Sequence, residues 1–124
     1  TVLACAEPDY GGRVDHPPEL AALGRLQAEA LRRQGANPEA GRLVGELFSA
    51  AGLSTTVGVM AGSWKAPATP EEGFAAEWGS RRHDLAGVLP PEELDRLERL
   101  DREAMFTGRR ILFVPTFYAL GIKR

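Results

Sequence analysis

The sequence predicts an α/β fold. Short apolar runs typical of strands alternate with longer segments whose apolar residues recur at helical spacing. The order is strand, two helices, strand, two helices, strand, with no internal repeat and no low-complexity linker. Strand–helix–strand order of this kind is typical of layered α/β domains. The composition fits such a domain, since 44% of the 124 residues are hydrophobic and 26% are charged.

The first strand is expected over residues 1–6, an uninterrupted run of small and apolar residues. A run without alternation favours a strand covered on both faces, as in a parallel sheet, with Cys5 buried. The polar segment 7–12 ends this strand, because Pro8 and the glycine pair that follows it favour turns.

Two helices are expected next. The first runs from Pro17 or Pro18 to Gly35, since proline is tolerated in the first turn of a helix and glycine is common just past its end. The second begins at Asn37, which has the right side chain for a helix cap, and ends at Gly52. Both segments carry one apolar stripe, so each helix should cover a core.

The second half of the chain predicts a strand, two helices and a strand. Residues 53–60 alternate, which indicates a strand that is half exposed or near a sheet edge. The capping box at 69–72 opens a third helix, and Pro90 opens a fourth. The last strand is expected at 116–123, preceded by a bend at Pro115, which cannot donate to a strand ladder.

Charge and hydropathy exclude several function classes. The net charge is −2 and the Lys and Arg residues are interleaved with acids, so no basic stripe is present and nucleic acid is not an expected partner. No apolar run approaches the roughly 20 residues that span a bilayer. The single cysteine favours a reducing, cytoplasmic location. His16 and His83 lie far apart in the sequence, so no metal site is expected.

Candidate substrate-binding residues follow the first strand. In open α/β sheets, ligands bind beyond the carboxyl ends of the parallel strands, and segment 7–16 lies there. Its polar candidates are Glu7, Asp9, Tyr10, Arg13 and His16. Each has a plainer alternative: Glu7 or Asp9 ties down amides of the turn, Asp15 caps the following helix, and His16 is an exposed turn residue.

Several stretches resemble class I S-adenosylmethionine-dependent methyltransferases. The strand that closes with Ala6-Glu7-Pro8-Asp9-Tyr10 resembles the fifth strand of that family. The stretch from Gly41 through Ala51-Gly52-Leu53 to Val57-Gly58-Val59 resembles the helix and sixth strand that come next. Ala119-Leu120-Gly121-Ile122-Lys123 is similar to the closing seventh strand, so the resemblance covers essentially the whole chain.

The resemblance implies a Rossmann-like sheet of which this chain supplies strands 5, 7 and 6, with strand 7 antiparallel. Residues 1–124 would then be the C-terminal portion of the domain, and 62–108 a helical lid inserted between the last two strands. S-adenosylmethionine would be the cofactor. The glycine-rich turn and the acids that bind it are absent here, so no residue of this chain is assigned to the cofactor and the chain is expected to be a fragment.

The lid would carry further acceptor contacts. Trp64 and Trp78 are expected to stack on a planar or apolar acceptor, or else to form, with Phe74, the core of the lid itself. Arg81 and its neighbours to Asp84 would meet an anionic acceptor group or form a solvated helix face. Phe117 and Tyr118 point to opposite sides of one strand, so only one of them can face a pocket.

The expected function is therefore the substrate-facing portion of a methyltransferase, a transferase that acts on a small molecule. The alternative is a non-catalytic module that binds a partner or dimerises. In either case the uncovered edge of the first strand should pair with a missing N-terminal half or with a second copy. A bare helical regulator is a third hypothesis, which an absence of strand content would favour.

Overall fold

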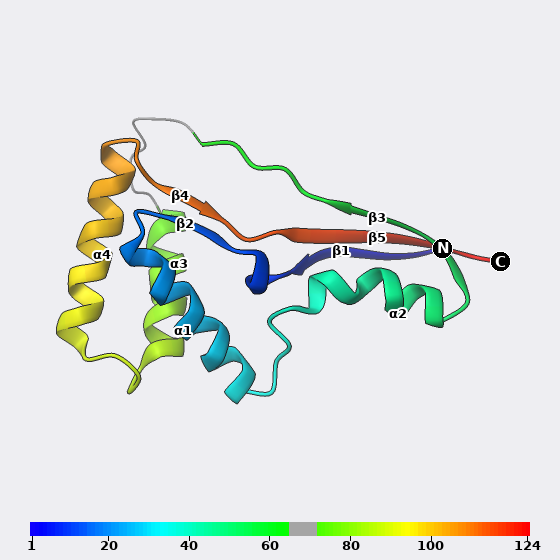
Figure 1. The fold of residues 1–124 in the computed structure, drawn as a ribbon, viewed down its shortest axis with the longest axis horizontal. Helices are drawn as coiled ribbons and strands as arrows, with labels where there is room; N and C mark the ends of the chain where they lie inside the picture. Colours follow the sequence, from blue (N-terminus) through cyan, green and yellow to red (C-terminus); the bar gives the residue numbers. More distant parts are fainter. Residues whose placement is uncertain (65–71) are drawn as a thin grey trace. The chain divides into compact units, whose positions relative to one another are not determined.

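The computed structural model describes residues 1–64 and 72–124, and in this part of the chain it confirms the α/β class (Figure 1). The strands are β1 (Val2–Pro8), β2 (Val14–His16), β3 (Leu53–Val59), β4 (Ile111–Phe113) and β5 (Thr116–Lys123). The helices are α1 (Glu19–Arg33), α2 (Val44–Ala50), α3 (Glu72–Leu85) and α4 (Pro91–Phe106), with 3-10 turns at Tyr10–Gly12 and Ala40–Leu43. The strands contradict the helical-regulator hypothesis. Thr69, Pro70 and Glu71 of the predicted capping box lie outside the described residues.

The chain forms two compact units. The sheet unit comprises residues 1–13, 37–62 and 113–124, and the helical unit comprises 14–36 and 63–112. The helical unit takes in the 62–108 segment that was predicted as an insertion, apart from its first residue, and it also includes α1.

The sheet unit is built on three strands in the order β1-β5-β3 (Figure 1). Both outer strands run antiparallel to β5, so β1 and β3 run in the same direction. The strand order and the directions agree with those predicted for the first, last and middle strands of the sequence. The bounds of β5 are those predicted, and β3 lies at an edge as its alternation indicated.

The prediction that β1 is covered on both faces is wrong. Among the described strands β1 pairs with β5 alone, and a bulge interrupts that pairing between Ala4 and Glu7. Val2 and Leu3 are exposed by 47% and 59%, and Cys5 is exposed as well. An uninterrupted apolar run indicates that both faces of a strand can be buried. It does not indicate whether the covering residues belong to the same chain.

The two sides of this sheet differ. On one side α2 packs against β3 and β5, where Ala119 is fully buried and a Cβ added at Gly121 would meet Phe48 of α2. On the other side the alternate residues of β5 are exposed, by 40% at Tyr118 and 54% at Ile122. Phe117 and Tyr118 therefore do point to opposite sides of the strand, as predicted.

The helical unit has its own apolar core. Helix α1 buries residues spaced three and four apart, and Gly35 follows its C-terminal end with φ +87°, a conformation that glycine adopts at little cost. Helices α3 and α4 complete the core, whose buried members are Leu20, Leu23, Ala30, Phe74, Trp78, Leu85, Leu94 and Leu97. Within the described residues, no helix has both the length and the apolar character needed to cross a membrane.

Candidate functional site

The end of β1 and the turn that follows it hold the first group of predicted site residues, all of them in the sheet unit. The strand ends at Pro8, and the chain then makes the 3-10 turn Tyr10–Gly12. Asp9 precedes that turn, and its Oδ1 accepts a hydrogen bond from the backbone N–H of Gly11 at 3.0 Å. This geometry confirms the alternative in which Asp9 ties down a turn amide.

A second partner occupies the Asp9 carboxylate. Arg42 donates from Nε to Oδ2 at 2.8 Å and from Nη2 to Oδ1 at 2.9 Å, which is the two-pronged geometry that fits guanidinium to carboxylate. The hydrogen bond to Asp9 raises the pKa of Arg42, although desolvation opposes it. The charge of Glu39, whose Oε1 lies 3.6 Å from Arg42 Nη2, raises this pKa further. The Asp9 side chain is only 7% exposed. The role of its carboxylate is therefore to stabilise the turn and not to bind a ligand.

Backbone contacts hold the same turn on two sides. The N–H of Tyr10 donates to the carbonyl of Pro38 at 2.7 Å, and the N–H of Asp9 donates to the carbonyl of Pro115 at 2.8 Å. At Gly41, an added Cβ would collide with the carbonyl oxygen of Glu7 and lie 2.8 Å from the ring of Phe117. The turn is thus fixed by the chain itself, before any ligand arrives.

The remaining polar groups at the end of β1 and in the turn after it differ in the hydrogen bonds and proton transfers that they can make. Glu7, Tyr10 and Arg13 are each half-buried. An ionised carboxylate accepts hydrogen bonds or a proton, a phenol donates or accepts, and a guanidinium only donates. Together they suit the orientation of a small polar molecule and the removal of a proton from it.

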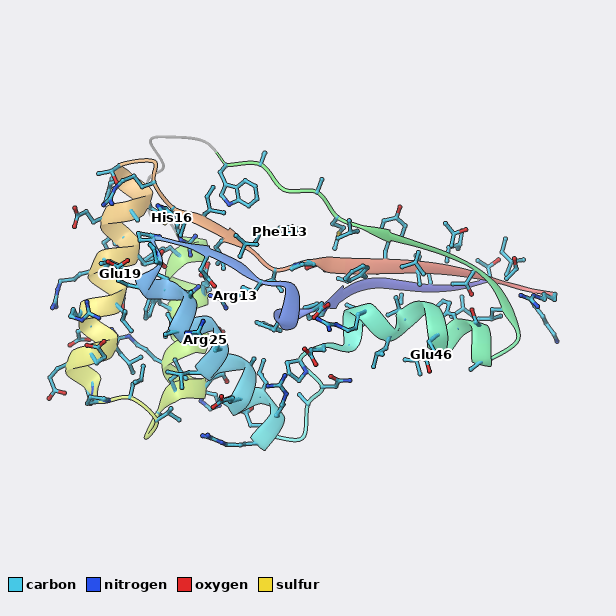
Figure 2. All side chains as sticks on the ribbon, viewed as in Figure 1. Arg13, His16, Glu19, Arg25, Glu46 and Phe113 are labelled. Atoms are coloured by element: carbon cyan, nitrogen blue, oxygen red, sulfur yellow. The ribbon has the colours of Figure 1, made fainter. Side chains whose placement is uncertain are left out.

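The other three predicted site residues lie in the helical unit. His16 is exposed, as its plainer alternative predicted, but it is the last residue of strand β2 and not a turn residue (Figure 2). Trp78 is 1% exposed and packs beside Phe74, with ring centroids 6.4 Å apart, so the two rings belong to the core of the helical unit, a core to which α1 also contributes. Trp64 is 47% exposed. The seven candidates are therefore divided between the two units.

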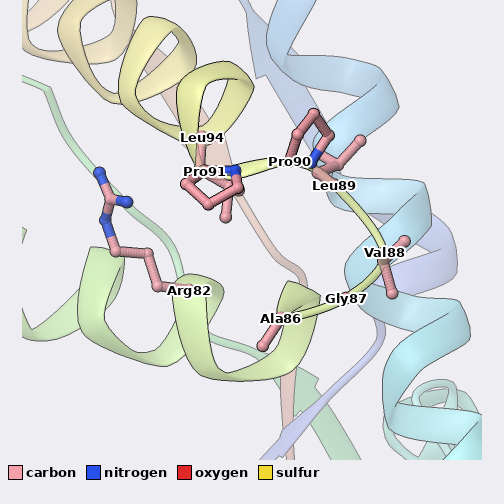
Figure 3. Close-up of a pocket in the computed structure, with 8 residues that line it drawn as sticks. All are labelled: Arg82, Ala86, Gly87, Val88, Leu89, Pro90, Pro91 and Leu94. Carbon is pink, nitrogen blue, oxygen red and sulfur yellow. The ribbon is translucent and has the colours of Figure 1, made fainter.

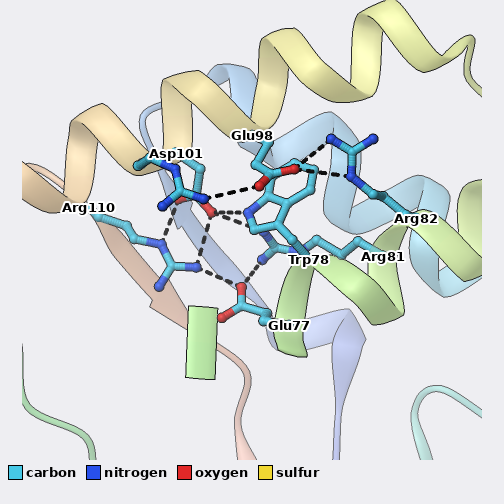
Figure 4. Close-up of polar contacts among 8 residues, drawn as sticks. Glu77, Trp78, Arg81, Arg82, Glu98, Asp101 and Arg110 are labelled. Carbon is cyan, nitrogen blue, oxygen red and sulfur yellow. Dashed lines mark hydrogen bonds and ion pairs between the residues drawn. The ribbon is translucent and has the colours of Figure 1, made fainter. Parts of the chain in front are cut away.

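A buried charge network joins α3 to α4 and to the residue before β4 (Figure 4). Asp101 is fully buried and accepts hydrogen bonds from Trp78 Nε1 at 2.9 Å, Arg81 at 3.0 Å and Arg110 Nε at 2.6 Å. Glu77 pairs with both arginines. Burial disfavours the charge of Arg110, but the hydrogen bonds and charges of Asp101 and Glu77 outweigh it and raise its pKa.

This network was not predicted from the sequence. Arg81 was placed on an anion-binding or solvated face, yet its side chain is only 3% exposed, so that prediction is wrong. The sequence does contain a sign that Asp101 is buried, because this residue falls on the same helical stripe as Leu94, Leu97 and Ala104. An acid on an apolar stripe requires a buried partner. No comparable signal indicated that Arg42 would reach Asp9, 33 residues away.

A shallow pocket of about 540 Å³ lies at the turn between α3 and α4 (Figure 3). Its wall consists of residues 86–91 and Leu94, which are glycine, proline and aliphatic residues. The charged lining residue is Arg82, which hydrogen-bonds to Asp95 at 2.8 Å and to Glu98. With its cation already paired, this pocket has apolar surface but no group for acid–base chemistry.

Two further findings bear on function. Across residues 1–64 and 72–124, no three His, Cys, Asp or Glu side chains gather closely enough to hold a metal ion. Comparison with family models, with curated proteins and with solved structures finds no match to this chain. Function has to be inferred from the geometry of the chain itself.

Proposed function

We propose that the chain is the C-terminal, acceptor-facing part of a class I S-adenosylmethionine-dependent methyltransferase that acts on a small molecule. One observation carries the proposal. Strand β5 runs antiparallel between β1 and β3, which share a direction. This is the arrangement that the resemblance implies for strands 5, 7 and 6, and the Glu-Pro-Asp-Tyr segment falls at the carboxyl end of β1, where that resemblance requires it.

In this function the turn after β1 holds the methyl acceptor. Methyl transfer is an in-line displacement, so the main contribution of the protein is alignment of the acceptor atom. Tyr10 and Arg13 would hold the acceptor by hydrogen bonds, and Glu7 would accept the proton that the acceptor loses. Asp9 and Arg42 would act through the turn by fixing its backbone, and they would not touch the acceptor.

The residues of this chain do not by themselves fit S-adenosylmethionine, the group that supplies the methyl when bound. Nucleotide-type sites place a glycine-spaced turn between a strand and the start of a helix. Here β1 leads through a 3-10 turn into β2, and the described residues contain no strand that leads through such a turn directly into a helix. We therefore assign no step of the reaction to a cofactor held by this chain.

The cofactor would be held by an N-terminal half that pairs with the outer edge of β1. Among the described strands β1 pairs with β5 alone, and Leu3 on β1 is 59% exposed. Unpaired strand edges next to exposed apolar surface favour strand addition. A second copy of the chain paired at the same edge is the alternative partner. We place the protein in the cytoplasm, because its single cysteine suits a reducing compartment.

A non-catalytic module that binds a partner or dimerises is the second candidate function. The observation that favours it is the exposed side of the sheet, where Tyr118, Leu120 and Ile122 of β5 are uncovered by 40%, 37% and 54%. Exposed apolar surface of this kind is typical of protein-binding sites. Such a module would need neither cofactor nor acceptor.

Calorimetric titration of S-adenosylmethionine distinguishes the two functions. The titrated samples are the 124-residue chain alone and the full-length product of its gene. We expect binding to the full-length product and none to the chain alone. Binding of comparable strength to the chain alone would contradict the assignment of the cofactor to an upstream half. Absence of binding to both samples would favour the non-catalytic module.

A further inference from the structure

The pocket at the turn between α3 and α4 has no role in the proposed function (Figure 3). Its volume of about 540 Å³ lies within the range of small-molecule sites. Its wall comes from residues 82–94, so the pocket lies entirely within the helical unit. The acceptor contacts proposed at the end of β1 and in the turn after it belong to the sheet unit. The pocket is therefore a separate candidate site.

The backbone of the α3–α4 turn fixes the shape of the pocket. The N–H groups of Val88 and Leu89 both donate to the carbonyl of Leu85, at 2.9 and 3.2 Å. Pro90 and Pro91, which follow, have restricted φ angles and no N–H. These four wall residues therefore hold a preformed apolar surface and have no free backbone N–H for a ligand.

Arg82 supplies a polar group at this wall. Its Nε donates to Glu98 at 3.0 Å, and its Nη2 donates to Asp95 at 2.8 Å and also to Glu98 (Figure 4). Among residues 1–64 and 72–124, its Nη1 has no hydrogen-bond partner. A guanidinium group only donates hydrogen bonds, so Nη1 selects a ligand that carries an acceptor.

The charges beside Arg82 favour a neutral acceptor over an anion. Arg102 also bonds to Glu98, at 3.2 Å, so the two arginines and the two acids of this cluster sum to zero charge. An anion would gain no net attraction from the cluster, would be repelled by the nearby carboxylates, and would lose hydration in an apolar pocket. A carbonyl oxygen accepts a hydrogen bond without these costs.

We propose that this pocket binds a small uncharged molecule that combines an apolar body with a carbonyl group, such as an amide or a ketone. The carbonyl oxygen accepts a hydrogen bond from Arg82 Nη1, and the apolar body contacts the aliphatic and proline side chains of the wall. The inference goes beyond the proposed function, because it requires neither a methyl acceptor nor a cofactor.

Titration followed in a ¹⁵N–¹H NMR spectrum of the 124-residue chain tests the class of ligand. The probe is cyclohexanecarboxamide, and cyclohexanecarboxylate is the matched control because it has nearly the same shape but carries a charge. We expect the carboxamide to shift the amide signals of Gly87, Val88 and Leu89 saturably, and the carboxylate to bind more weakly. Equal or tighter binding of the carboxylate, or no saturable shift with the carboxamide, would overturn the inference.

Asp95→Asn tests the effect of charge. Removal of this carboxylate should reduce the preference for the carboxamide over the carboxylate by about fivefold, the effect of one like charge at about 4 Å in water. Glu103→Gln should leave the preference unchanged, because Glu103 lies on the same helix but is 71% exposed and does not line the pocket. The inference fails if Asp95→Asn also leaves the preference unchanged.

Two further variants test the hydrogen bond and the location of the site. Arg82→Met keeps an unbranched side chain but removes the donors, and it should weaken carboxamide binding about tenfold. Ala86→Leu places a larger side chain at the wall and should abolish binding, whereas Ala76→Leu, at an exposed position of α3 outside the wall, should not. An unchanged amide signal of the buried Leu23 reports that the helical unit has kept its fold. Full affinity in either Arg82→Met or Ala86→Leu would contradict the proposed site.

Discussion

The environment of a single residue decides whether a polar side chain belongs to the site or to the scaffold. Asp9 has the residue type of a catalytic base, but Arg42 and the N–H of Gly11 occupy both of its oxygens. Glu7, at the end of β1, and Tyr10, in the turn itself, are half-buried. Residue type and position could be predicted from the sequence, but the partner of Asp9, 33 residues away, depends on how segment 38–42 folds back onto the turn.

Replacing Asp101 with asparagine should destabilise the chain strongly. The change leaves Arg81 and Arg110 without their buried counter-charge, and loss of one member of a buried ion pair costs about 3–5 kcal/mol. The matched control is Glu103→Gln on the same helix, whose side chain is 71% exposed and which should change stability by less than about 0.5 kcal/mol. Urea unfolding followed by tryptophan fluorescence measures the stability of both variants; equal effects would contradict the role of the network.

Replacing glycine with alanine should lower the stability of the chain at one position and raise it at another. At Gly41 the new Cβ would collide with the Glu7 carbonyl and lie 3.0 Å from the carbonyl carbon of Pro8, so backbone has to move and the sheet unit should lose stability. At Gly79, in the exposed interior of α3, a Cβ meets nothing within 4 Å. Alanine there should raise stability by roughly 0.5–1 kcal/mol. Thermal unfolding of the two variants tests both signs.

Whole elements could be predicted better than their pairing. Apolar spacing and proline positions indicated α1, α4, β3 and β5, since those signals are local. Strand β2 was missed because Val14–His16 is too short and polar to show a period, and it becomes a strand only by pairing with β4, nearly 100 residues away. The second helix was predicted from Asn37, but 3-10 geometry occupies Ala40–Leu43 and the α-helix starts at Val44.

The first turn of α4 should stabilise the chain in a pH-dependent way. Hydrogen bonds from Arg96, at 2.8 and 2.9 Å, lower the pKa of Glu93 despite a small opposing desolvation. Because its folded pKa lies below the unfolded value of about 4.3, the stabilisation is present above that pH and is lost as pH falls through the folded pKa. The effect is small, since the pair is exposed.

Melting temperatures of the wild type and of Glu93→Gln, compared from neutral pH down to below the unfolded pKa of Glu93, test the expectation. The difference should be constant at neutral pH and vanish in acid. Glu92→Gln removes an acid from the same helical turn and controls for the interaction with the helix dipole. If Glu92→Gln lowered the melting temperature at neutral pH as much as Glu93→Gln does, the result would contradict the assignment of the stabilisation to the Glu93–Arg96 pair.

At the scale of the whole molecule, exposed apolar surface is unevenly distributed. Most of the exposed large hydrophobic side chains belong to the sheet unit. On the side of the sheet that α2 does not cover, here called the open side, such side chains come from β1 and β5. The strand register places Leu120 between Leu3 of β1 and Thr56 of β3, and it places Ile122 opposite Ser54, so these paired positions carry no charged side chain. A surface with these properties requires a cover, whichever of the two proposed functions holds.

The isolated chain should therefore self-associate through this side, and Leu3→Ser combined with Ile122→Ser should keep it monomeric. Both side chains are more than half exposed, at 59% and 54%, so their loss removes little packing within the chain and should change stability only slightly. Leu47→Ser is the matched control, because Leu47 is 61% exposed on α2, which packs on the opposite side of the sheet. Sedimentation velocity measures the association. If the control also abolishes association, or the double variant does not, the contact lies elsewhere on the molecule. If the double variant in addition no longer binds a separately expressed upstream half, the same surface serves both partners, and self-association is the substitute for a missing half.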